Sequence, residues 1–436
     1  MPVPRLHVDT SPASMFRYRS RLIGALVIAG VMPTHAGAQT PMERMAAVRQ
    51  QIVAGNAARA LQMLDSLQPL VPDHPNLLFL RAHALGKAGR MSEAAEAIRS
   101  LQRRDARYAQ LALRDSSVMA LRPDFPAIDS LAAAASRPFT RAKVWAMIAE
   151  RDLIAEGTAY DPATRSVLVG SLNMYKVVAI APDGSVSDRV AVGAGGIRSI
   201  AGIHVDTARG VLWAASNARY DTPTDSTPSA LFAFDARTGA FRARVPVPDS
   251  GAHFLNDIVT GADGTVYVTD SRSGRVFRAR PGDTILQHFA ALGPMISPNG
   301  ITISSDGRVL FVTDADHVRG HDLASGETWR IAMPDSIVVS GIDGLAFAGG
   351  ALIAHHPLAF WRVARYPLDE RWRRIVGREL IEANTPDGRT STTGEVVGGD
   401  YVFIGNSQID RMNLRTIDAA TMEPIRIYRA PIAPVP

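Results

Sequence analysis

The feature that most constrains the fold of this chain is a strand pair that occurs six times over the last two-thirds of the sequence. In one copy, residues 297–314 read as a short alternating strand, a Ser-Asp-Gly turn and a second β-branched strand, which is the pattern of a hairpin. Each copy opens on a head residue followed by a small residue, and successive heads are 45, 55, 43, 44 and 50 residues apart. The six head pairs are Glu156-Gly157, Ala201-Gly202, Asn256-Asp257, Asn299-Gly300, Asp343-Gly344 and Thr393-Gly394.

Repeats of this length with strand pairs predict a β-propeller in which each repeat is one four-stranded blade, so the fold class is mainly β with six blades. The innermost strands of a propeller run along a central channel, and residues at one repeat position therefore converge on its axis. The expected ring is Glu156, Ala201, Asn256, Asn299, Asp343 and Thr393. Its two carboxylates and two amides are an all-oxygen set that suits a hard cation such as Ca²⁺. Without a cation the facing carboxylates would repel one another.

A helical pattern precedes the propeller. Four positions of one helical unit are followed 34 residues later by their counterparts, in the pairs Gly55 and Gly89, Ala60 and Ala94, Leu64 and Ile98, Pro72 and Ala106. This period resembles that of tetratricopeptide repeats, and residues 76–90 fit that family well. The domain is expected to bind a peptide or protein, or else to serve as a packing buttress.

These patterns predict a small all-α tetratricopeptide-like domain over 41–122, a proline-containing linker over 123–140 and the propeller over 141–436. Residues 143–148 read as a strand before the first head. We expect it to pair with the C-terminal strands and close the ring, because closure removes free sheet edges.

The first 38 residues predict an export signal. Residues 17–21 are basic, residues 22–31 are apolar but too short to span a bilayer, and Ala36-Gly37-Ala38 has the form of a cleavage site. Translation from Met15 would give a signal of more usual length, and a retained N-terminal anchor is the alternative. The chain has no Cys, which excludes disulfides, thiolate metal sites and a lipid anchor on cysteine. A periplasmic or secreted protein with no membrane contact after cleavage is expected.

The formal charge of +5 does not indicate a nucleic-acid partner. Three of those charges lie in the first 38 residues, which leaves +2 on the rest of the chain. A hydrophobic fraction of 46% with 20% charged residues is typical of a globular protein that buries a sizeable core.

The head motifs, in their order along the chain, resemble those of the SMP-30/gluconolactonase/LRE-like six-bladed propellers and their paraoxonase-type relatives. The resemblance covers roughly 144–427 and rests on the Glu-Gly, Asn-Asp, Pro-Asn-Gly and Asp-Gly elements together. It implies one divalent cation, usually Ca²⁺, with Glu156, Asn256, Asn299 and Asp343 as its ligands. It also implies hydrolysis of lactones, esters or phosphoesters, in which the cation polarises the substrate oxygen.

Asp257 is the first candidate for a catalytic carboxylate, because the other five heads are followed by Gly. Three roles are open to it. It could act as a general base or nucleophile, it could orient the side chain of Asn256 as a metal ligand, or it could be a turn residue. Asp343 could serve as both ligand and base.

Two differences from the family's motifs narrow the expected substrate class and the expected number of metal ions. Sugar-lactone members often carry Arg where this chain has Phe254, which favours a hydrophobic lactone or ester as substrate. Paraoxonase-type members have an acid where this chain has Gly157, so one metal is expected rather than two.

Four histidines and two further aspartates are also candidates for functional or structural roles. His253, three residues before Asn256, is expected either to shuttle protons at the cavity mouth or to be structural. One of His355 and His356 could point toward the cavity, whereas His204 is expected to be structural. The aspartates that follow second strands, Asp270 and Asp314, are expected to stabilise turns.

Two functions of different classes follow from the sequence. The first is an exported, metal-dependent hydrolase of the lactonase or esterase type. The second is a non-catalytic propeller that binds a protein or small ligand and holds a structural cation. Propellers host many functions, so the fold by itself does not choose between them.

Overall fold

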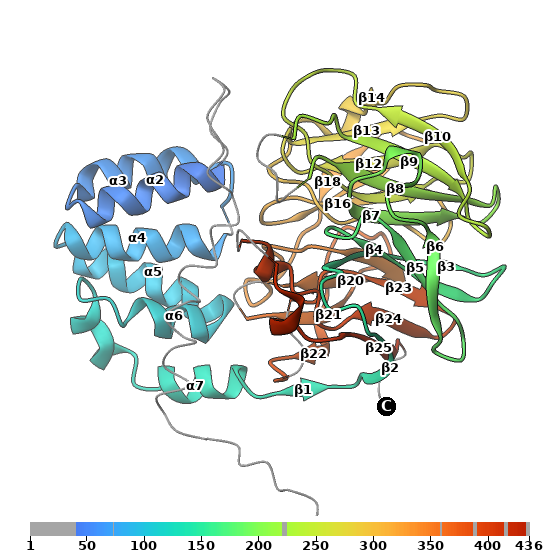
Figure 1. The fold of residues 1–436 in the computed structure, drawn as a ribbon. Helices are drawn as coiled ribbons and strands as arrows, with labels where there is room; N and C mark the ends of the chain where they lie inside the picture. Colours follow the sequence, from blue (N-terminus) through green and yellow to red (C-terminus); the bar gives the residue numbers. More distant parts are fainter. Residues whose placement is uncertain are drawn as a thin grey trace, which may run out of the picture.

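The computed structural model describes residues 41–72, 74–219, 225–357, 360–386, 390–413 and 417–432. Its strands form six separate antiparallel sheets arranged as a ring, with a layer of helices against one face (Figure 1). The predicted six-bladed propeller with a small N-terminal helical domain is therefore confirmed. The predicted export signal lies outside the described residues.

Every blade has four strands counted from the axis outward, and blade 5 carries a fifth. Blades 1 to 3 are β3 (Ala155–Asp161), β4 (Ser166–Ser171), β5 (Val177–Ile180) and β6 (Val186–Val190); β7 (Ser199–Asp206), β8 (Val211–Asn217), β9 (Ala230–Asp235) and β10 (Phe241–Pro246); β11 (Leu255–Thr260), β12 (Val266–Asp270), β13 (Arg275–Ala279) and β14 (Gln287–His288). Blades 4 to 6 are β15 (Ile301–Ile303), β16 (Val309–Thr313), β17 (Val318–Asp322) and β18 (Thr328–Arg330); β19 (Leu345–Ala348), β20 (Ala351–His356), β21 (Arg362–Pro367), β22 (Glu379–Ala383) and β1 (Phe139–Thr140); β23 (Gly394–Val397), β24 (Asp400–Ile404), β25 (Ile425–Pro431) and β2 (Lys143–Ile148).

The ring closes through the strand expected from the sequence. β2 pairs antiparallel with β25, so the last blade combines the start and the end of the propeller sequence. The innermost strands contact one another in the cycle β3, β7, β11, β15, β19, β23 and back to β3. Because these strands begin at the repeated heads, all six heads lie at one end of the central channel.

The propeller is held together between its blades. Each of the six junctions between neighbouring blades contains its own cluster of buried apolar side chains. Between blades 1 and 2, for example, Leu168 and Ile203 are buried together, and Phe311 and Leu352 are buried between blades 4 and 5. Burial of apolar area contributes roughly 25 cal/mol per Å², so these junctions supply the main stabilisation of the ring.

The N-terminal domain consists of helices packed around one apolar core. They are α2 (Pro41–Val53), α3 (Ala57–Leu67), α4 (Pro75–Lys87), α5 (Met91–Arg104), α6 (Ala106–Ala112) and α7 (Ile128–Ala135). Gly55 and Gly89 end equivalent helices with φ of 81° and 73°, a conformation that favours glycine. The helical pairs follow the predicted period, and their membership of the tetratricopeptide family stays a prediction. Among the described residues, no helix has the length and apolar character needed to cross a membrane.

The segment predicted as a linker is ordered. Residues 123–140 contain the end of a 3₁₀ turn, η1 (Met119–Asp124), then α7, then β1. β1 pairs with β22 at the outer edge of blade 5. The connection between the two domains is therefore attached to the propeller through the backbone hydrogen bonds of a paired edge strand.

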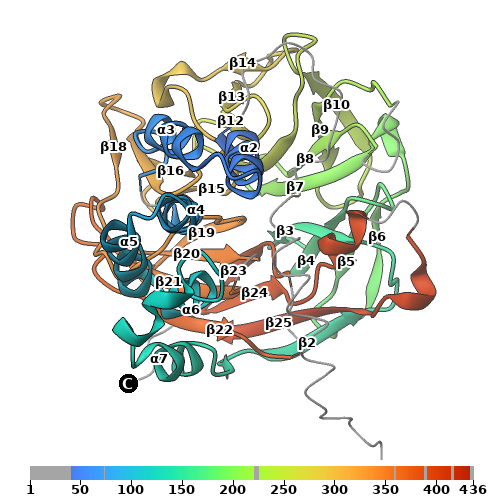
Figure 2. The same ribbon diagram turned by 90° about the vertical axis from the view of Figure 1, so that its left-hand side faces the viewer.

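The helical domain rests on the face of the propeller where the inner strands begin (Figure 2). Ile296 and Ala315, which lie in loops on that face, pack against the helical core. Arg107 of α6 bonds to Asn384 at 2.9 Å and its guanidinium lies 4.2 Å from the centre of the Phe360 ring. The helices therefore cover blades 4 and 5 on the face that carries the heads.

Candidate functional site

The heads are brought together by glycines that allow adjacent inner strands to approach closely. A Cβ atom at Gly157 would lie 2.6 Å from the carbonyl oxygen of Ala201, and one at Gly202 would lie 2.2 Å from that of Asn256. Gly300 and Gly344 meet the next blade in the same way, at 2.4 and 2.7 Å. No side chain fits at these positions without moving the neighbouring backbone, which explains why the head of most blades is followed by glycine.

Asp257 takes this position in blade 3. Its backbone N–H donates to the Thr269 hydroxyl at 3.1 Å, and that hydroxyl donates to the carbonyl oxygen of Asn299 at 2.7 Å. The Thr269 side chain thereby bonds blade 3 to the head of blade 4. The carboxyl group of Asp257 takes no part in this link and faces other groups of the channel. Burial and the nearby Asp343 raise the pKa of Asp257 to about 8.

Glu156 lies at an irregularity of β3, where the pairing with β4 shifts register between Glu156 and Thr158. The residue is buried, and its Oε2 atom has no hydrogen-bond partner among the described residues. Burial, followed by the charges of Asp343 and Asp257, raises its pKa well above the usual range. The three carboxyl groups therefore interact electrostatically although blades 1, 3 and 5 supply one each.

Asn299 and Asp343 are in direct contact. The amide nitrogen of Asn299 donates to Oδ1 of Asp343 at 2.6 Å. Oδ1 of Asn299 is buried and has no hydrogen-bond partner in the described chain. Burial raises the pKa of Asp343, and the hydrogen bond from Asn299 opposes that rise.

The Asn256 side chain is oriented by its neighbours. Its amide nitrogen donates to the Ser271 hydroxyl at 3.1 Å, and Ser271 donates to the carbonyl oxygen of Pro298 at 2.7 Å. The amide oxygen of Asn256 is therefore turned away from Ser271 and remains available as a ligand atom. The backbone before it is fixed as well, by a residue that the sequence analysis did not single out.

That residue is Asn217, at the end of β8. Its amide nitrogen donates to the carbonyl oxygen of Leu255, and its Oδ1 accepts from the N–H of Leu255, both at 2.8 Å. The Ser229 hydroxyl donates to the same Oδ1 at 2.9 Å. Asn217 thus holds the residue before Asn256 through both backbone groups, across the junction of two blades. Its sequence signal is weak, because an Asn at a strand end is common in turns.

Whether a cation fits this arrangement depends on its donor set. Among the described residues, no group of three or more His, Asp and Glu side chains is placed to hold a metal ion. The candidate ligands are instead two carboxylates and two amides, and amide oxygens are ordinary ligands of Ca²⁺. The two partnerless oxygens on Glu156 and Asn299 are the acceptors that a hard cation would satisfy, so the residues fit such an ion.

His253 lies outside this group of oxygens. Its Nδ1 atom is 2.5 Å from Oδ2 of Asp270, and its Nε2 atom is 2.9 Å from Oδ1 of Asp249. The bond to Asp270, followed by that to Asp249, raises the pKa of His253 against the effect of burial. Both ring nitrogens contact carboxylates, which suits the structural alternative for His253, and the proton shuttle stays a prediction.

The other singled-out residues also have structural partners. His355 lies between the hydroxyl groups of Ser391 and Tyr401, and His356 contacts the hydroxyl of Tyr366. His204 contacts Thr260.

The two aspartates that follow second strands lie in turns. Asp270 and Asp314 accept backbone N–H groups of their own turns, in agreement with the role expected for them.

Apolar side chains surround the head end of the channel. Ile154, Leu172, Ala201 and Met422 are buried in one cluster, and Phe254 packs against it. Met422 comes from the connection between β24 and β25, which crosses this face and is bonded to Arg151. Polar groups at the heads thus lie beside an apolar wall.

Comparisons with known proteins find structural similarity at low sequence identity. No protein-family model and no curated protein matches the sequence. Among solved structures the chain is similar to a gluconolactonase from Xanthomonas campestris, with 18% identity, a TM-score of 0.46, and 69% of this chain and 92% of that one covered. It is also similar to the calcium-binding protein regucalcin from Agrobacterium tumefaciens, with 15% identity, a TM-score of 0.46, and 66% and 93% covered.

A virginiamycin B lyase from Staphylococcus aureus is similar at 15% identity and a TM-score of 0.43, with 60% of this chain and 81% of that one covered. The neighbours thus include SMP-30/gluconolactonase/regucalcin-like propellers at low identity alongside a protein named for another reaction.

Proposed function

We propose that this protein is an exported hydrolase of lactones or related esters that works with one divalent cation, Ca²⁺ by the chemistry of its ligands. The observation that carries the proposal is the meeting of Glu156, Asn299 and Asp343 at one end of the channel, with two buried oxygens left without partners. Asn256 completes the proposed ligand set. When bound, the cation would supply Lewis-acid polarisation of the substrate carbonyl.

Asp257 is the proposed catalytic carboxylate. Without a nearby positive charge its raised pKa keeps it protonated at neutral pH, and a protonated carboxyl group is no base. Opposite charge favours the ionised form, so a filled ligand set would convert Asp257 into a base at the pH where the enzyme works.

The reaction that this residue can perform is proton transfer during ester cleavage. Asp257 takes a proton from the water whose oxygen forms a bond to the carbonyl carbon. It then returns that proton to the alkoxide oxygen as the carbon–oxygen bond of the ring breaks, which leaves a hydroxy acid. Direct attack by the Asp257 carboxylate, with water cleaving the acyl-enzyme afterwards, is the other route open to the same side chain.

The partly exposed ring of Phe254 supports a hydrophobic substrate. Phe254 stands two residues before Asn256 and packs on the cluster of Ile154, Leu172 and Met422. An alkyl or aryl group placed there is removed from water, whereas a sugar would leave hydroxyl groups without partners. The helical domain, which covers part of the same face, is proposed to limit access to the mouth and to offer a surface for a protein partner.

A panel of alkyl lactones, sugar lactones and aryl esters, assayed with Ca²⁺ and with a chelator, tests this function. Turnover of hydrophobic members that disappears on chelation and returns with Ca²⁺ is the expected result. If the protein takes up Ca²⁺ but hydrolyses nothing in the panel, the cation is structural and the protein is a binding propeller. If it hydrolyses the panel equally well in chelator, the proposed role of the cation is wrong.

A further inference from the structure

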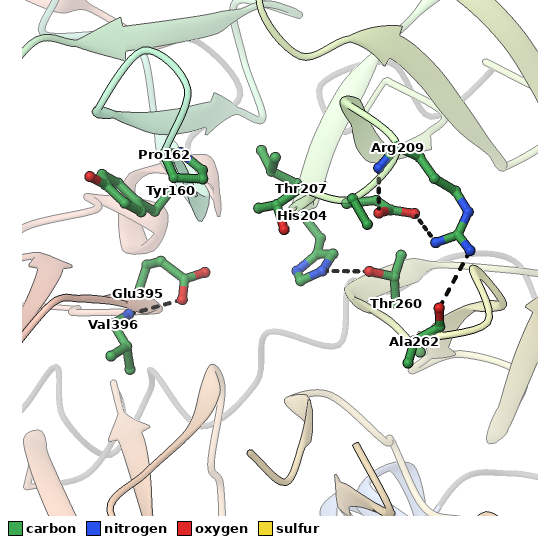
Figure 3. A pocket seen from close by; sticks show the side chains of 13 residues that line it. Tyr160, Pro162, His204, Thr207, Arg209, Thr260, Ala262, Glu395 and Val396 are labelled. Carbon is green, nitrogen blue, oxygen red and sulfur yellow. Dashed lines mark hydrogen bonds and ion pairs between the residues drawn. The ribbon is translucent and has the colours of Figure 1, made fainter. Parts of the chain in front are cut away.

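The channel has a second opening at the end opposite the heads. A cavity of about 380 Å³ lies there, lined by the far ends of the inner strands β3, β7, β11 and β23 (Figure 3). This face is the one that the helical domain leaves uncovered, because the helices contact the head face. Cavities of this volume are at the small end of those that hold low-molecular-weight ligands.

Glu395 is the notable group of this cavity. It lies on β23 two residues beyond Thr393, and its Oε1 accepts the N–H of the adjacent Val396, at 2.9 Å. No Arg or Lys forms an ion pair with it in the described parts of the chain. The side chain is surrounded by the channel walls yet keeps partial exposure through the open mouth. Burial raises the pKa of Glu395 to about 7.

The remaining walls supply no positive charge to balance it. Arg209 is the one cationic residue of the lining, and it is paired with Asp206 at 3.2 Å and bonded to the carbonyl oxygen of Ala262. His204 contacts Thr260 at 3.0 Å, and burial lowers its pKa to about 4, so it is neutral near pH 7. The lining thus carries one uncompensated carboxyl group.

Apolar surface lies beside that group. Figure 3 shows Glu395 and Val396 on one side of the cavity, His204 and Thr260 on another, and Tyr160 with Pro162 on a third. A metal ion does not suit this composition, because one carboxylate gives too few of the six to eight oxygens that Ca²⁺ takes. A charge that carries its own apolar part does.

We propose that this cavity is a binding site for a small organic cation, an ammonium group on a short apolar chain, with Glu395 as its counter-charge. The ammonium donates to the free oxygen of Glu395, and the chain lies against Tyr160, Pro162 and Val396. Because it uses no residue of the head end, this site holds or fails independently of the proposed hydrolase.

Isothermal titration calorimetry with n-propylammonium, and with propionate as an anion of matched size, tests the site in the full-length protein. Saturating Ca²⁺ is present throughout so that cation uptake at the heads does not interfere. We expect millimolar binding of propylammonium, no binding of propionate, and affinity at least about tenfold lower in Glu395→Gln, since a charge-assisted bond is lost. Glu370→Gln, an exposed carboxyl change elsewhere, and Asp257→Asn should bind as wild type does.

A second variant covers the case in which Glu395→Gln does not fold. Thr260→Lys places an ammonium of the protein's own beside the cavity and should abolish propylammonium binding. Equal binding of propionate, unchanged affinity in Glu395→Gln, or loss of binding in Asp257→Asn would each overturn the proposal. So would the absence of any heat with propylammonium.

Discussion

The two ends of the central channel differ in how many buried carboxyl groups they bring together. At the head end, burial raises the pKa values of Glu156, Asp257 and Asp343, the charge of Asp343 raises the first two further, and amide groups stand beside them. At the opposite mouth a single carboxyl group, Glu395, faces a neutral histidine and apolar side chains. The same strands line both ends, so the proposed divalent-cation site and the proposed organic-cation site would lie along one axis. The number of facing oxygens decides which.

The largest difference that we expect between the two ends of the channel is the effect of a substitution on kcat. Asp257→Asn should lower kcat for the best lactone or ester at least about 100-fold, because the amide cannot accept the proton of water. Steady-state kinetics in Ca²⁺ measures it. Asp183→Asn, in an exposed turn of blade 1, and Glu395→Gln, at the opposite mouth, are the controls that should keep wild-type activity. A loss below about tenfold in Asp257→Asn would leave that residue a supporting role only.

Calcium should stabilise the protein through one end of the channel. At a concentration 100 times its Kd, a ligand that binds only the folded state adds about 2.7 kcal/mol to the free energy of unfolding. Glu156→Gln should remove most of the rise in Tm that Ca²⁺ produces, whereas Glu395→Gln should preserve it. Thermal melts with and without Ca²⁺ measure both. An undiminished rise in Glu156→Gln would contradict the ligand set.

The hydrogen bonds between the Asn217 side chain and the Leu255 backbone can be removed to test whether they position Asn256. Asn217→Ala removes three hydrogen bonds and should lower Ca²⁺ affinity and kcat by about tenfold while KM changes less, because Asn256 loses its fixed backbone. Calorimetry of Ca²⁺ binding together with kinetics separates this from simple destabilisation. Asn56→Ala, in the helical domain, is a matched control. A lower Tm with unchanged Ca²⁺ affinity would make Asn217 merely structural.

The smallest expected effect is a difference in pH dependence. A carboxyl group whose pKa is raised on folding favours the folded state at low pH, and this contribution is lost as the pH rises from the unfolded value through the folded one. Calcium-free protein should therefore lose stability between about pH 4 and pH 8 through Asp257, and between about pH 4 and pH 7 through Glu395.

Denaturant unfolding across this range, in chelator, measures the effect. Asp257→Asn should flatten the profile more than Glu395→Gln does, and Ca²⁺ should flatten it in wild type but leave the contribution of Glu395. If both variants give the wild-type slope, the two carboxyl groups are ionised in the folded protein.

The fold could be predicted from the sequence because its signals are local and repeated. The period of the heads fixed the number of blades, and the strand at 143–148 was expected to close the ring, as it does. The glycines after the heads were visible as a pattern, and the structure gives their reason, which is the close approach of adjacent inner strands. Asp257 was singled out by the same pattern.

Only the tertiary structure decided which atoms have partners. Asn217 and Leu255 are 38 residues apart, and their contact depends on the packing of two blades. The spacing of His253 from Asn256 is visible in the sequence, whereas the contacts of its ring with Asp249 and Asp270 are visible only in the structure. Within the linker predicted from its prolines, β1 is a strand because the edge of blade 5 offers β22 for pairing.

The sequence by itself determined the ring of blades and the residue types at its heads, since hydrophobic period and turn chemistry act over a few residues. The tertiary structure decided which face the helices cover, which oxygens lack partners and where Glu395 lies. Those properties depend on burial and on groups from several blades, and burial is set by the whole chain at once.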